Sequence, residues 1–308
     1  MSDTAHLPAA PGTGPVDAPA WLASLERDFP ARDLALGDGA VVRLRACGPE
    51  GASTLVLLHG IGSGSASWLP CALTLAAGHR VIAWDAPGYG GSTPLPEAAP
   101  RAEAYAARLE AALAALGVAR CLLVGHSLGA LVAAAYARAH PARLAGLVLL
   151  CPAGGYGGPG QEAERERVRH ERLSTLQALG IAGLAATRGP KLLRPQASAQ
   201  AREWAQWNMA QLREPGYRQA VELLCGEALP HHAPAPVPTW VHAGAQDTVT
   251  PPAKVRALAA AFGVAPGAVV EIADAGHLCA LEQPQAVAAL LGAAALAAGL
   301  GAAAGARR

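Results

Sequence analysis

The stretch CLLVGHSLGALVAAAYA, residues 121–137, joins a short apolar run to a helical pattern of small residues through Gly-His-Ser-Leu-Gly. A serine between two glycines, where a strand becomes a helix, is typical of a sharp turn that lifts the hydroxyl clear of a sheet. Gly125 and Gly129 leave room for such a turn, and the first amides of the following helix favour negative charge near the serine. Ser127 is therefore our candidate nucleophile.

Strand-like apolar runs alternate with helical patterns along most of the chain. Strands are expected at 40–46, 53–60, 80–86, 120–126, 144–152, 237–244 and 268–275, and helices at 67–77, 101–116, 128–140, 252–262 and 282–295. Several of the strands are apolar throughout, as strands buried on both faces of a parallel sheet are. The alternation predicts an α/β fold with a doubly wound, mostly parallel sheet.

The alternation stops between residues 153 and 236, where a charged helical pattern, two tryptophans and a Pro-rich return replace the strands. Long loops without secondary structure are uncommon in compact domains, so we expect a helical cap over 153–236. The cap would interrupt a core made of residues 31–152 and 237–296. Residues 1–30 and 297–308 are expected to be flexible tails.

Composition excludes several function classes. The chain has 308 residues with 24 Lys and Arg against 23 Asp and Glu, and no long basic run, so we expect no nucleic-acid or membrane partner. Six widely spaced cysteines without a C-x-x-C pair favour a reducing compartment, the cytoplasm. The N-terminus does not resemble a signal peptide, and the uncharged run 286–306 is too rich in Ala and Gly to favour membrane insertion.

A serine hydroxyl is a poor nucleophile without a base, and the base needs an orienting carboxylate. Asp247 follows a late expected strand in WVHAGAQDTVTPP, and His277 follows the last one in EIADAGHLCALEQP. Loops at the carboxyl ends of parallel strands meet at one edge of the sheet. The sequence thus predicts a triad of Ser127, His277 and Asp247. We expect the rival Asp274 to brace a loop, and His126 cannot serve Ser127 because neighbours around the turn point apart.

Two backbone amides should stabilise the oxyanion that forms when Ser127 attacks a carbonyl. One is the amide of Leu128, directly after the serine. The second comes from the glycine-rich loop LLHGIGSGSASW, with Ile61 as first choice and Gly62 as second.

The cap offers three candidate substrate-binding residues at helical spacing, Trp204, Trp207 and Gln211. They could line an acyl pocket and favour a hydrophobic substrate. The alternative is that both tryptophans pack the cap on the core.

The segments LHGIGSGSASW, DAPGYGGS, GHSLG, GAQDTVTPP and DAGHLCALEQP together resemble the α/β-hydrolase superfamily, in the branch with a helical cap, over about residues 31–296. Within it the chain looks most like carboxylesterases and 3-oxoadipate enol-lactonases. Carbon–carbon bond hydrolases of ring-cleavage products usually carry Trp after the catalytic His, where this chain has Leu278. Haloalkane dehalogenases and epoxide hydrolases use Asp as the nucleophile, where this chain has Ser127.

The resemblance implies a serine hydrolase that cleaves a carboxylic ester or lactone through an acyl-enzyme intermediate. This chemistry needs no cofactor and no metal. A carbon–carbon bond hydrolase, an acyltransferase and a low-turnover ligand receptor on the same scaffold stay open as alternatives. The sequence does not indicate the oligomeric state.

Overall fold

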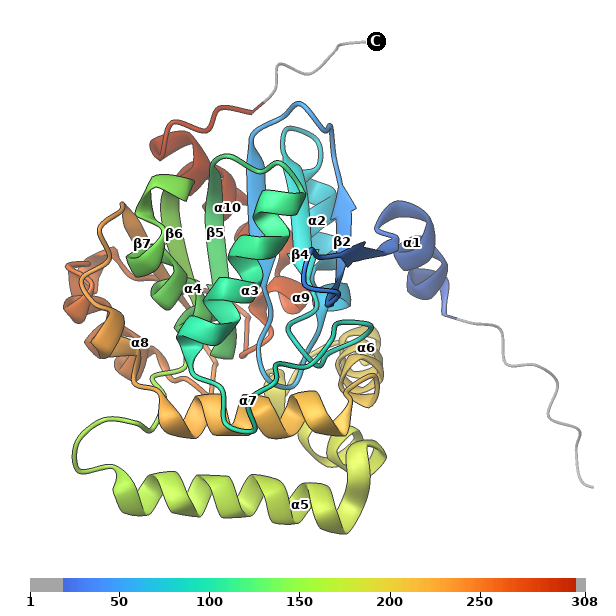
Figure 1. Ribbon diagram of the computed structural model, residues 1–308, viewed down its shortest axis with the longest axis vertical. Coiled ribbons are helices and arrows are strands. Elements are labelled where there is room, and N and C mark those ends of the chain that lie inside the picture. The colour runs from blue at the N-terminus through green and yellow to red at the C-terminus, as the bar shows by residue number, and fades with distance from the viewer. Residues whose placement is uncertain (1–18, 303–308) are drawn as a thin grey trace, which may run out of the picture.

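The computed structural model describes residues 19–302, in which eight strands form one sheet in the order β1-β2-β4-β3-β5-β6-β7-β8 (Figure 1). The pairings that link β4, β3, β5, β6, β7 and β8 are all parallel, whereas β2 pairs antiparallel with both β1 and β4. The predicted α/β fold with a mostly parallel sheet is confirmed. The strands are β1 (Ala31–Ala35), β2 (Val41–Cys47), β3 (Thr54–Leu58), β4 (Arg80–Trp84), β5 (Cys121–His126), β6 (Leu144–Leu150), β7 (Thr239–Gly244) and β8 (Val270–Ile272).

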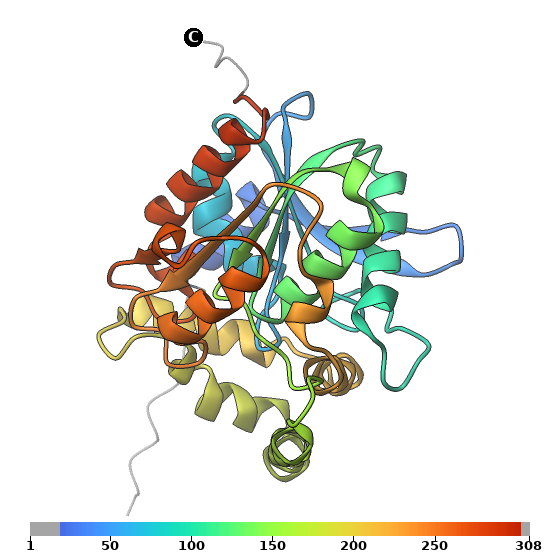
Figure 2. The same ribbon diagram turned by 90° about the vertical axis from the view of Figure 1, so that its left-hand side faces the viewer.

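Helices cover both faces of the sheet, as the edge-on view in Figure 2 shows. One hydrophobic core lies between the sheet and α3 (Ala102–Ala115), α4 (Leu128–Ala139) and α8 (Pro252–Ala261). The other core lies between the sheet and α1 (Ala20–Asp28), α2 (Leu69–Leu75), α9 (Cys279–Glu282) and α10 (Pro284–Ala297). Helix α4 is buried from Leu128 to Ala137, because its small side chains let it lie close to the sheet.

The segment between β6 and β7 is helical and lies across the edge of the sheet where the parallel strands end (Figure 1). It contains α5 (Glu162–Arg188), α6 (Ala199–Ala210) and α7 (Glu214–Gly226). Helix α5 bends at Gly180, whose φ of 61° suits a residue without a Cβ. A 2.8 Å ion pair between Arg169 and Glu222 ties α5 to α7.

The chain ends differ from the expected tails where the structure describes them. Residues 20–28 form α1, and Trp21, Leu25 and Phe29 are buried in the core beside α2 and α10, because their spacing of four places them on one helix face. At the other end, α10 runs to Ala297, Leu300 packs on the same core, and the Gly301 carbonyl accepts a 2.9 Å hydrogen bond from Ser53. The rest of the expected tails, residues 1–18 and 303–308, lies outside the described residues.

The uncharged C-terminal run forms α10, an ordinary outer helix of the sheet. Within residues 19–302, no helix combines the length and the apolar character needed to cross a bilayer.

Candidate active site

Ser127 stands at the turn from β5 into α4 with a φ of 53° and a ψ of −117°, which places a non-glycine residue in the left-handed region. Glycine is required at both flanking positions because a side chain there would clash with neighbouring backbone atoms. A Cβ on Gly125 would lie 2.5 Å from the carbonyl oxygen of Gly129, and a Cβ on Gly129 would lie 2.7 Å from that of Leu58. Helix α4 therefore starts directly against β3 and β5, and the strained serine lies over the carboxyl ends of the strands.

The three residues of the expected triad form one hydrogen-bonded row. His277 Nδ1 lies 2.8 Å from Asp247 Oδ2, and His277 Nε2 lies 2.9 Å from Ser127 Oγ. An ionised carboxylate can only accept, so Nδ1 carries the ring proton and Nε2 presents its lone pair to the serine hydroxyl. This is the tautomer that a general base needs. All three residues are buried.

The Asp247 carboxylate is surrounded by donors, and one of them, Thr250, is not among the site residues expected from the sequence. Asp247 Oδ1 accepts from the backbone N–H groups of Val249 and Thr250, at 2.7 and 2.9 Å. Asp247 Oδ2 accepts from Thr250 Oγ1 at 2.7 Å besides His277 Nδ1. Burial raises the pKa of Asp247, but the hydrogen bonds from His277 and Thr250 outweigh burial and hold that pKa below its ordinary value. The carboxylate is therefore ionised and fixed in orientation.

The two amides expected to hold the oxyanion lie at the start of α4 and after β3. The Gly60 carbonyl accepts from His59 Nδ1 at 2.8 Å and from the Ser63 amide at 3.1 Å, so the Ile61 N–H of the same peptide points the opposite way. A Cβ on Gly60 would lie 2.9 Å from Ser127 Cβ, which shows how closely this loop approaches the serine. Leu128 is the first residue of α4, where an amide has no intrahelical acceptor. Within residues 19–302, no hydrogen-bond acceptor engages either the Ile61 or the Leu128 amide.

Gly62, the second choice for the oxyanion, has a different neighbour. A Cβ on Gly62 would lie 2.6 Å from the Met209 side chain of the cap. Tyr89 Oη donates to the Ile61 carbonyl at 2.9 Å and so fixes the Ile61–Gly62 peptide. The loop is thus held from both core and cap.

His126 makes no hydrogen bond to Ser127 among the described residues, and it instead supports the backbone of His277, the candidate base. Its Nε2 lies 2.8 Å from the His277 carbonyl oxygen, which can only accept, so Nε2–H donates. Burial lowers the pKa of His126 to about 3, so the ring stays neutral. It fixes the backbone of His277 without adding a charge beside the imidazole.

The loop that carries His277 is also held by a cap residue. Arg194 pairs with Asp274 at 3.0 Å, so the rival carboxylate braces a loop as expected. Glu282 accepts from the Gly276 amide at 2.8 Å and from the Arg194 amide at 3.1 Å. Burial raises the pKa of Glu282 above its ordinary value. The Leu278 amide completes the link by donating to the Leu192 carbonyl at 3.0 Å.

Comparison with known proteins identifies the family of this chain. Residues 55–290 match the model of the alpha/beta hydrolase family. The chain belongs to this family. A 2-hydroxy-6-oxononadienedioate/2-hydroxy-6-oxononatrienedioate hydrolase from Pseudomonas putida is 41% identical over 113 residues, which cover 35% of this chain and 39% of that relative. The chain thus aligns with about two-fifths of the length of this curated relative.

Two solved structures share the fold over most of the hydrolase chain. A thermophilic esterase from Thermogutta terrifontis has a TM-score of 0.71 and 26% identity, covering 85% of this chain and 96% of the esterase. The enol-lactonase from Burkholderia xenovorans LB400 has a TM-score of 0.73 and 24% identity, covering 86% of this chain and all of the lactonase.

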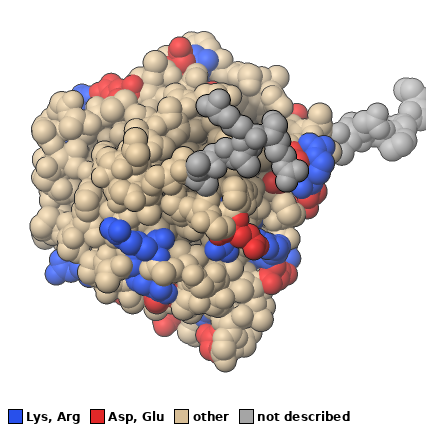
Figure 3. Space-filling model, turned by 90° about the horizontal axis from the view of Figure 1, so that it is seen from above, with Lys and Arg blue, Asp and Glu red and all other residues tan. Residues whose placement is uncertain are grey.

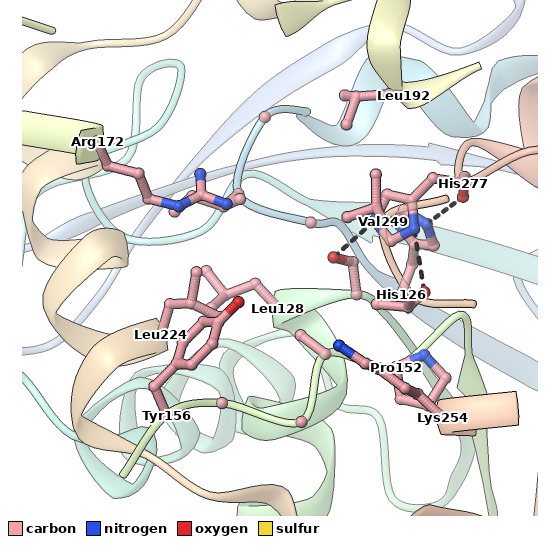
Figure 4. A pocket seen from close by; sticks show the side chains of 18 of the residues that line it. His126, Leu128, Pro152, Tyr156, Arg172, Leu192, Leu224, Val249, Lys254 and His277 are labelled. Atoms are coloured by element: carbon pink, nitrogen blue, oxygen red, sulfur yellow. Dashed lines mark hydrogen bonds between the residues drawn. The ribbon is translucent and has the colours of Figure 1, made fainter. Parts of the chain in front are cut away.

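A cavity of about 670 Å³ lies between the hydrolase core and the cap, and Ser127, His277 and Leu128 open onto it (Figure 4). Its walls carry apolar side chains from the cap, from strand-end loops of the core and from α8. These include Leu184, Leu192, Met209, Leu224, Val249 and Leu258. The candidate nucleophile is therefore reached from a substrate-sized cavity that lies between core and cap.

None of Trp204, Trp207 and Gln211 lines this cavity, which corrects the expected substrate-binding role. Trp204 stacks on Trp21 with ring centroids 4.5 Å apart, and Trp207 meets the same ring edge-on at 5.1 Å. Gln211 is exposed and donates to the Trp207 carbonyl. The alternative, in which the tryptophans pack the cap on the core, is what the structure has, with α1 as the partner.

Two groups of side chains could in principle offer metal ligands among the described residues. His126, Cys151 and His277 form one, and Glu103, Glu227 and His232 form the other. Both ring nitrogens of His277 already have partners in the triad, and Glu227 is bound by Arg101 at 2.7 Å. Both groups are therefore engaged within the protein.

Proposed function

We propose that this protein hydrolyses a carboxylic ester or lactone through an acyl-enzyme formed on Ser127. The observation that carries the proposal is the hydrogen-bonded row from Asp247 through His277 to Ser127, which opens onto the cavity between core and cap. The likeness to the Thermogutta terrifontis esterase over nearly its whole length supports an ester as the substrate.

In the first half of the reaction, Ser127 Oγ forms a bond to the acyl carbon while its proton passes to His277 Nε2. The carbonyl electrons move onto oxygen, and the amides of Ile61 and Leu128 donate to that oxyanion. Asp247 stabilises the imidazolium through Nδ1–H. When the tetrahedral species collapses, the bond to the leaving oxygen breaks, and that oxygen takes the proton from Nε2.

In the second half, water takes the place of the leaving alcohol. His277 accepts a proton from the water as its oxygen bonds to the acyl carbon, and the same two amides hold the second oxyanion. The bond to Ser127 Oγ then breaks, the serine regains its proton from His277, and a carboxylic acid leaves.

A second candidate is hydrolysis of a carbon–carbon bond in a ring-cleavage product. The match to the Pseudomonas putida hydrolase, 41% identical over 113 residues, favours it. Leu278 counts against it, because the resemblance implies Trp at that position in such enzymes. Both candidates use the same nucleophile and base, so they differ in substrate and not in the position of the triad.

The test is a panel of aryl esters, lactones and ring-fission dienes, assayed with the wild type and with Ser127→Ala. We expect turnover of esters or lactones, and we expect Ser127→Ala to lower kcat by about 10³-fold or more, because the nucleophile is lost. Preferential turnover of the dienes would favour the second candidate. Turnover of esters by Ser127→Ala at the parental rate would refute the assignment of the nucleophile.

Two other functions are possible on this scaffold, and product analysis and active-site labelling distinguish them from hydrolysis. An acyltransferase would divert the acyl group to an added alcohol or amine, which product analysis detects. A ligand receptor would turn over aryl esters slowly or not at all. Stoichiometric labelling of Ser127 by a fluorophosphonate, together with fast ester turnover, would contradict the receptor.

A further inference from the structure

Within residues 19–302, the cavity above Ser127 is lined by positively charged side chains and by no negatively charged ones. Four cationic side chains line it, and no Asp or Glu among the described residues does; the four are Arg172, Arg188, Lys191 and Lys254. The chain as a whole is almost balanced, with 24 Lys and Arg against 23 Asp and Glu. Lysine occurs at only two positions in the sequence, 191 and 254, and both line this cavity.

The outer surface does not share this bias on the face turned away from the cap. Figure 3 shows that most of this face is uncharged, and that its positive residues (Lys, Arg) and negative residues (Asp, Glu) lie in small groups. The charge on that face is mixed, and the chain as a whole is almost neutral, so the purely positive lining of the cavity differs from both.

Three of the four cations lack a carboxylate partner within the described part of the chain. No Asp or Glu oxygen there lies within 4.0 Å of Arg172, Lys191 or Lys254, whereas Arg188 pairs with Glu171 at 3.4 Å. None of these three side chains therefore forms an ion pair within residues 19–302, although Glu164 lies close enough to Lys254 for a Coulombic interaction, and both lysines are exposed.

Arg172 is the most informative of them because it is half-buried. Its Nε is buried and has no hydrogen-bond partner within residues 19–302, and its Nη1 reaches only the Tyr217 hydroxyl, at 3.5 Å. A buried charged donor without an acceptor is costly, so its persistence indicates a ligand that supplies one. A guanidinium in a cavity matches the planar geometry of a carboxylate.

Lys254 faces Arg172 from the core side of the cavity. Arg172 extends from α5 in the cap and Lys254, an exposed residue, extends from α8, and both line the cavity that Ser127 and His277 also line (Figure 4). A substrate held over Ser127 would therefore lie between a cation of the cap and a cation of the core.

We propose that the substrate carries a free carboxylate besides the carbonyl that Ser127 attacks, and that Arg172 and Lys254 select it. This proposal rests on the proposed function of the same site. The carboxylate supplies the acceptor that the Arg172 guanidinium lacks, and both cations favour an anion over a neutral chain of the same length. The apolar wall residues then hold the methylene chain between the two carbonyl groups.

The test compares two esters that differ only at the far end of the acyl chain. They are mono-(4-nitrophenyl) adipate, which bears a carboxylate, and 4-nitrophenyl hexanoate, which does not. We expect the wild type to show a kcat/KM for the adipate at least about tenfold above that for the hexanoate, a difference of about 1.4 kcal/mol. Raising the salt from 0.05 to about 0.5 M should lower this ratio, because ions screen the cations.

Three variants locate the effect. Lys254→Met and Arg172→Met keep the aliphatic stem and remove the charge, and each should lower the adipate-to-hexanoate ratio about tenfold, while Lys254→Arg should retain most of it. Arg256→Met is the matched control, because Arg256 lies on the same helix, pairs with Glu271 and does not line the cavity. Its ratio should equal that of the wild type. Arg172 and Lys254 stand on different elements, so the test survives if one variant fails to fold.

The outcomes separate this inference from the proposed function. Hexanoate hydrolysis that depends on Ser127, with no preference for the adipate or with a ratio that both Met variants leave unchanged, would overturn the inference and leave the proposed function standing. If neither ester is turned over, calorimetric titration of the wild type with adipate decides. Binding that both Met variants weaken supports the carboxylate site, and absent or unaltered binding overturns it.

Discussion

Replacing Thr250 with valine should expose how much the buried Asp247 carboxylate depends on its donors. The hydroxyl proton of Thr250 lies between two acceptors, Asp247 Oδ2 at 2.7 Å and the Cys151 carbonyl at 3.1 Å, and the closer, charged one should hold it. Valine keeps the shape of the side chain and removes this donor. A hydrogen bond to a charged group contributes about 1.5–3 kcal/mol, so we expect Thr250→Val to lower the free energy of unfolding by about 2 kcal/mol at pH 7.

The same change should affect catalysis less than loss of Asp247 itself. His277 Nδ1 still has Oδ2 as its acceptor, and Oδ1 still accepts from two amides, so the variant loses alignment and not the charge. We expect kcat/KM for an aryl ester to fall about tenfold, which corresponds to about 1.4 kcal/mol of transition-state stabilisation.

The pH dependence gives an independent check. The Thr250 hydrogen bond is one cause of the lowered pKa of Asp247. A group whose pKa is lowered by folding stabilises the protein above its unfolded pKa, and this contribution is lost as the pH falls through the folded pKa. The stability difference between wild type and variant should therefore be full at pH 7 and shrink below about pH 4.

Urea unfolding at several pH values, with Thr250→Ser alongside, measures these effects. Serine keeps the hydroxyl and loses one methyl group, which should cost under about 1 kcal/mol. A Thr250→Val protein as stable at pH 7 as the wild type, or no more destabilised than Thr250→Ser, would show that the hydroxyl does not hold the carboxylate.

Three further predictions concern a buried histidine and two glycines. Burial lowers the pKa of His242 from 6.5 to about 4, and neither ring nitrogen has a hydrogen-bond partner within residues 19–302. As the pH falls, His242 therefore becomes protonated in the unfolded chain at a higher pH than in the folded protein. That difference should remove about 2 kcal/mol of stability between pH 7 and pH 5, and His242→Leu should lack this loss; parallel pH profiles in urea titrations would contradict it. Gly60→Ala should lower kcat/KM for an aryl ester about 100-fold or more while the fold is kept by circular dichroism, because its Cβ would lie 2.9 Å from Ser127 Cβ. Gly292→Ala, in α10 with nothing within 4 Å of the new Cβ, should raise the free energy of unfolding by about 0.5–1 kcal/mol with unchanged activity, and a loss of stability would refute this.

Most of the fold could be predicted from the sequence because the central strands are buried on both faces. Such strands are continuous apolar runs, and every one of the seven expected runs overlaps with a strand of the sheet. The edge strand β1 could not be found this way. Its sequence ARDLA is exposed or half-buried, and Asp33 pairs with Arg43 of the next strand across the sheet edge. The cytoplasmic location expected from the cysteines stays a prediction.

Helix α1 differs from the prediction for another reason. It follows a Pro- and Gly-rich segment whose composition predicts a flexible tail, here expected over residues 1–30. The spacing of Trp21, Leu25 and Phe29 is nonetheless a helical signal. A helix at this position supplies Trp21 as a stacking partner for Trp204, which argues against a place for Trp204 in a substrate pocket.

The candidate triad could be placed from sequence because each role admits few residue types, and each lies just after a strand whose end is recognisable. The supporting residues have no such restriction. Thr250 is one of two threonines in DTVT, and only the folded turn shows that its hydroxyl faces Asp247 and that Thr248 does not share this contact. Arg172 stands among many Arg and Glu residues of α5, and the packing of the cap decides which of them faces inward.

From the contacts between cap and core we predict that the cap contributes to catalysis as well as to substrate access. Asn208 of α6 donates to Ser63 Oγ at 3.0 Å in the loop that carries the Ile61 amide. On the opposite side of the site, the Leu192 carbonyl binds the amide that follows His277. A shift of the cap would therefore strain the loops that hold the candidate oxyanion donor, Ile61, and the candidate base, His277, at the same time. Substitutions that loosen the cap should then lower kcat together with any change in KM, whereas a cap that only admits substrate would affect KM alone.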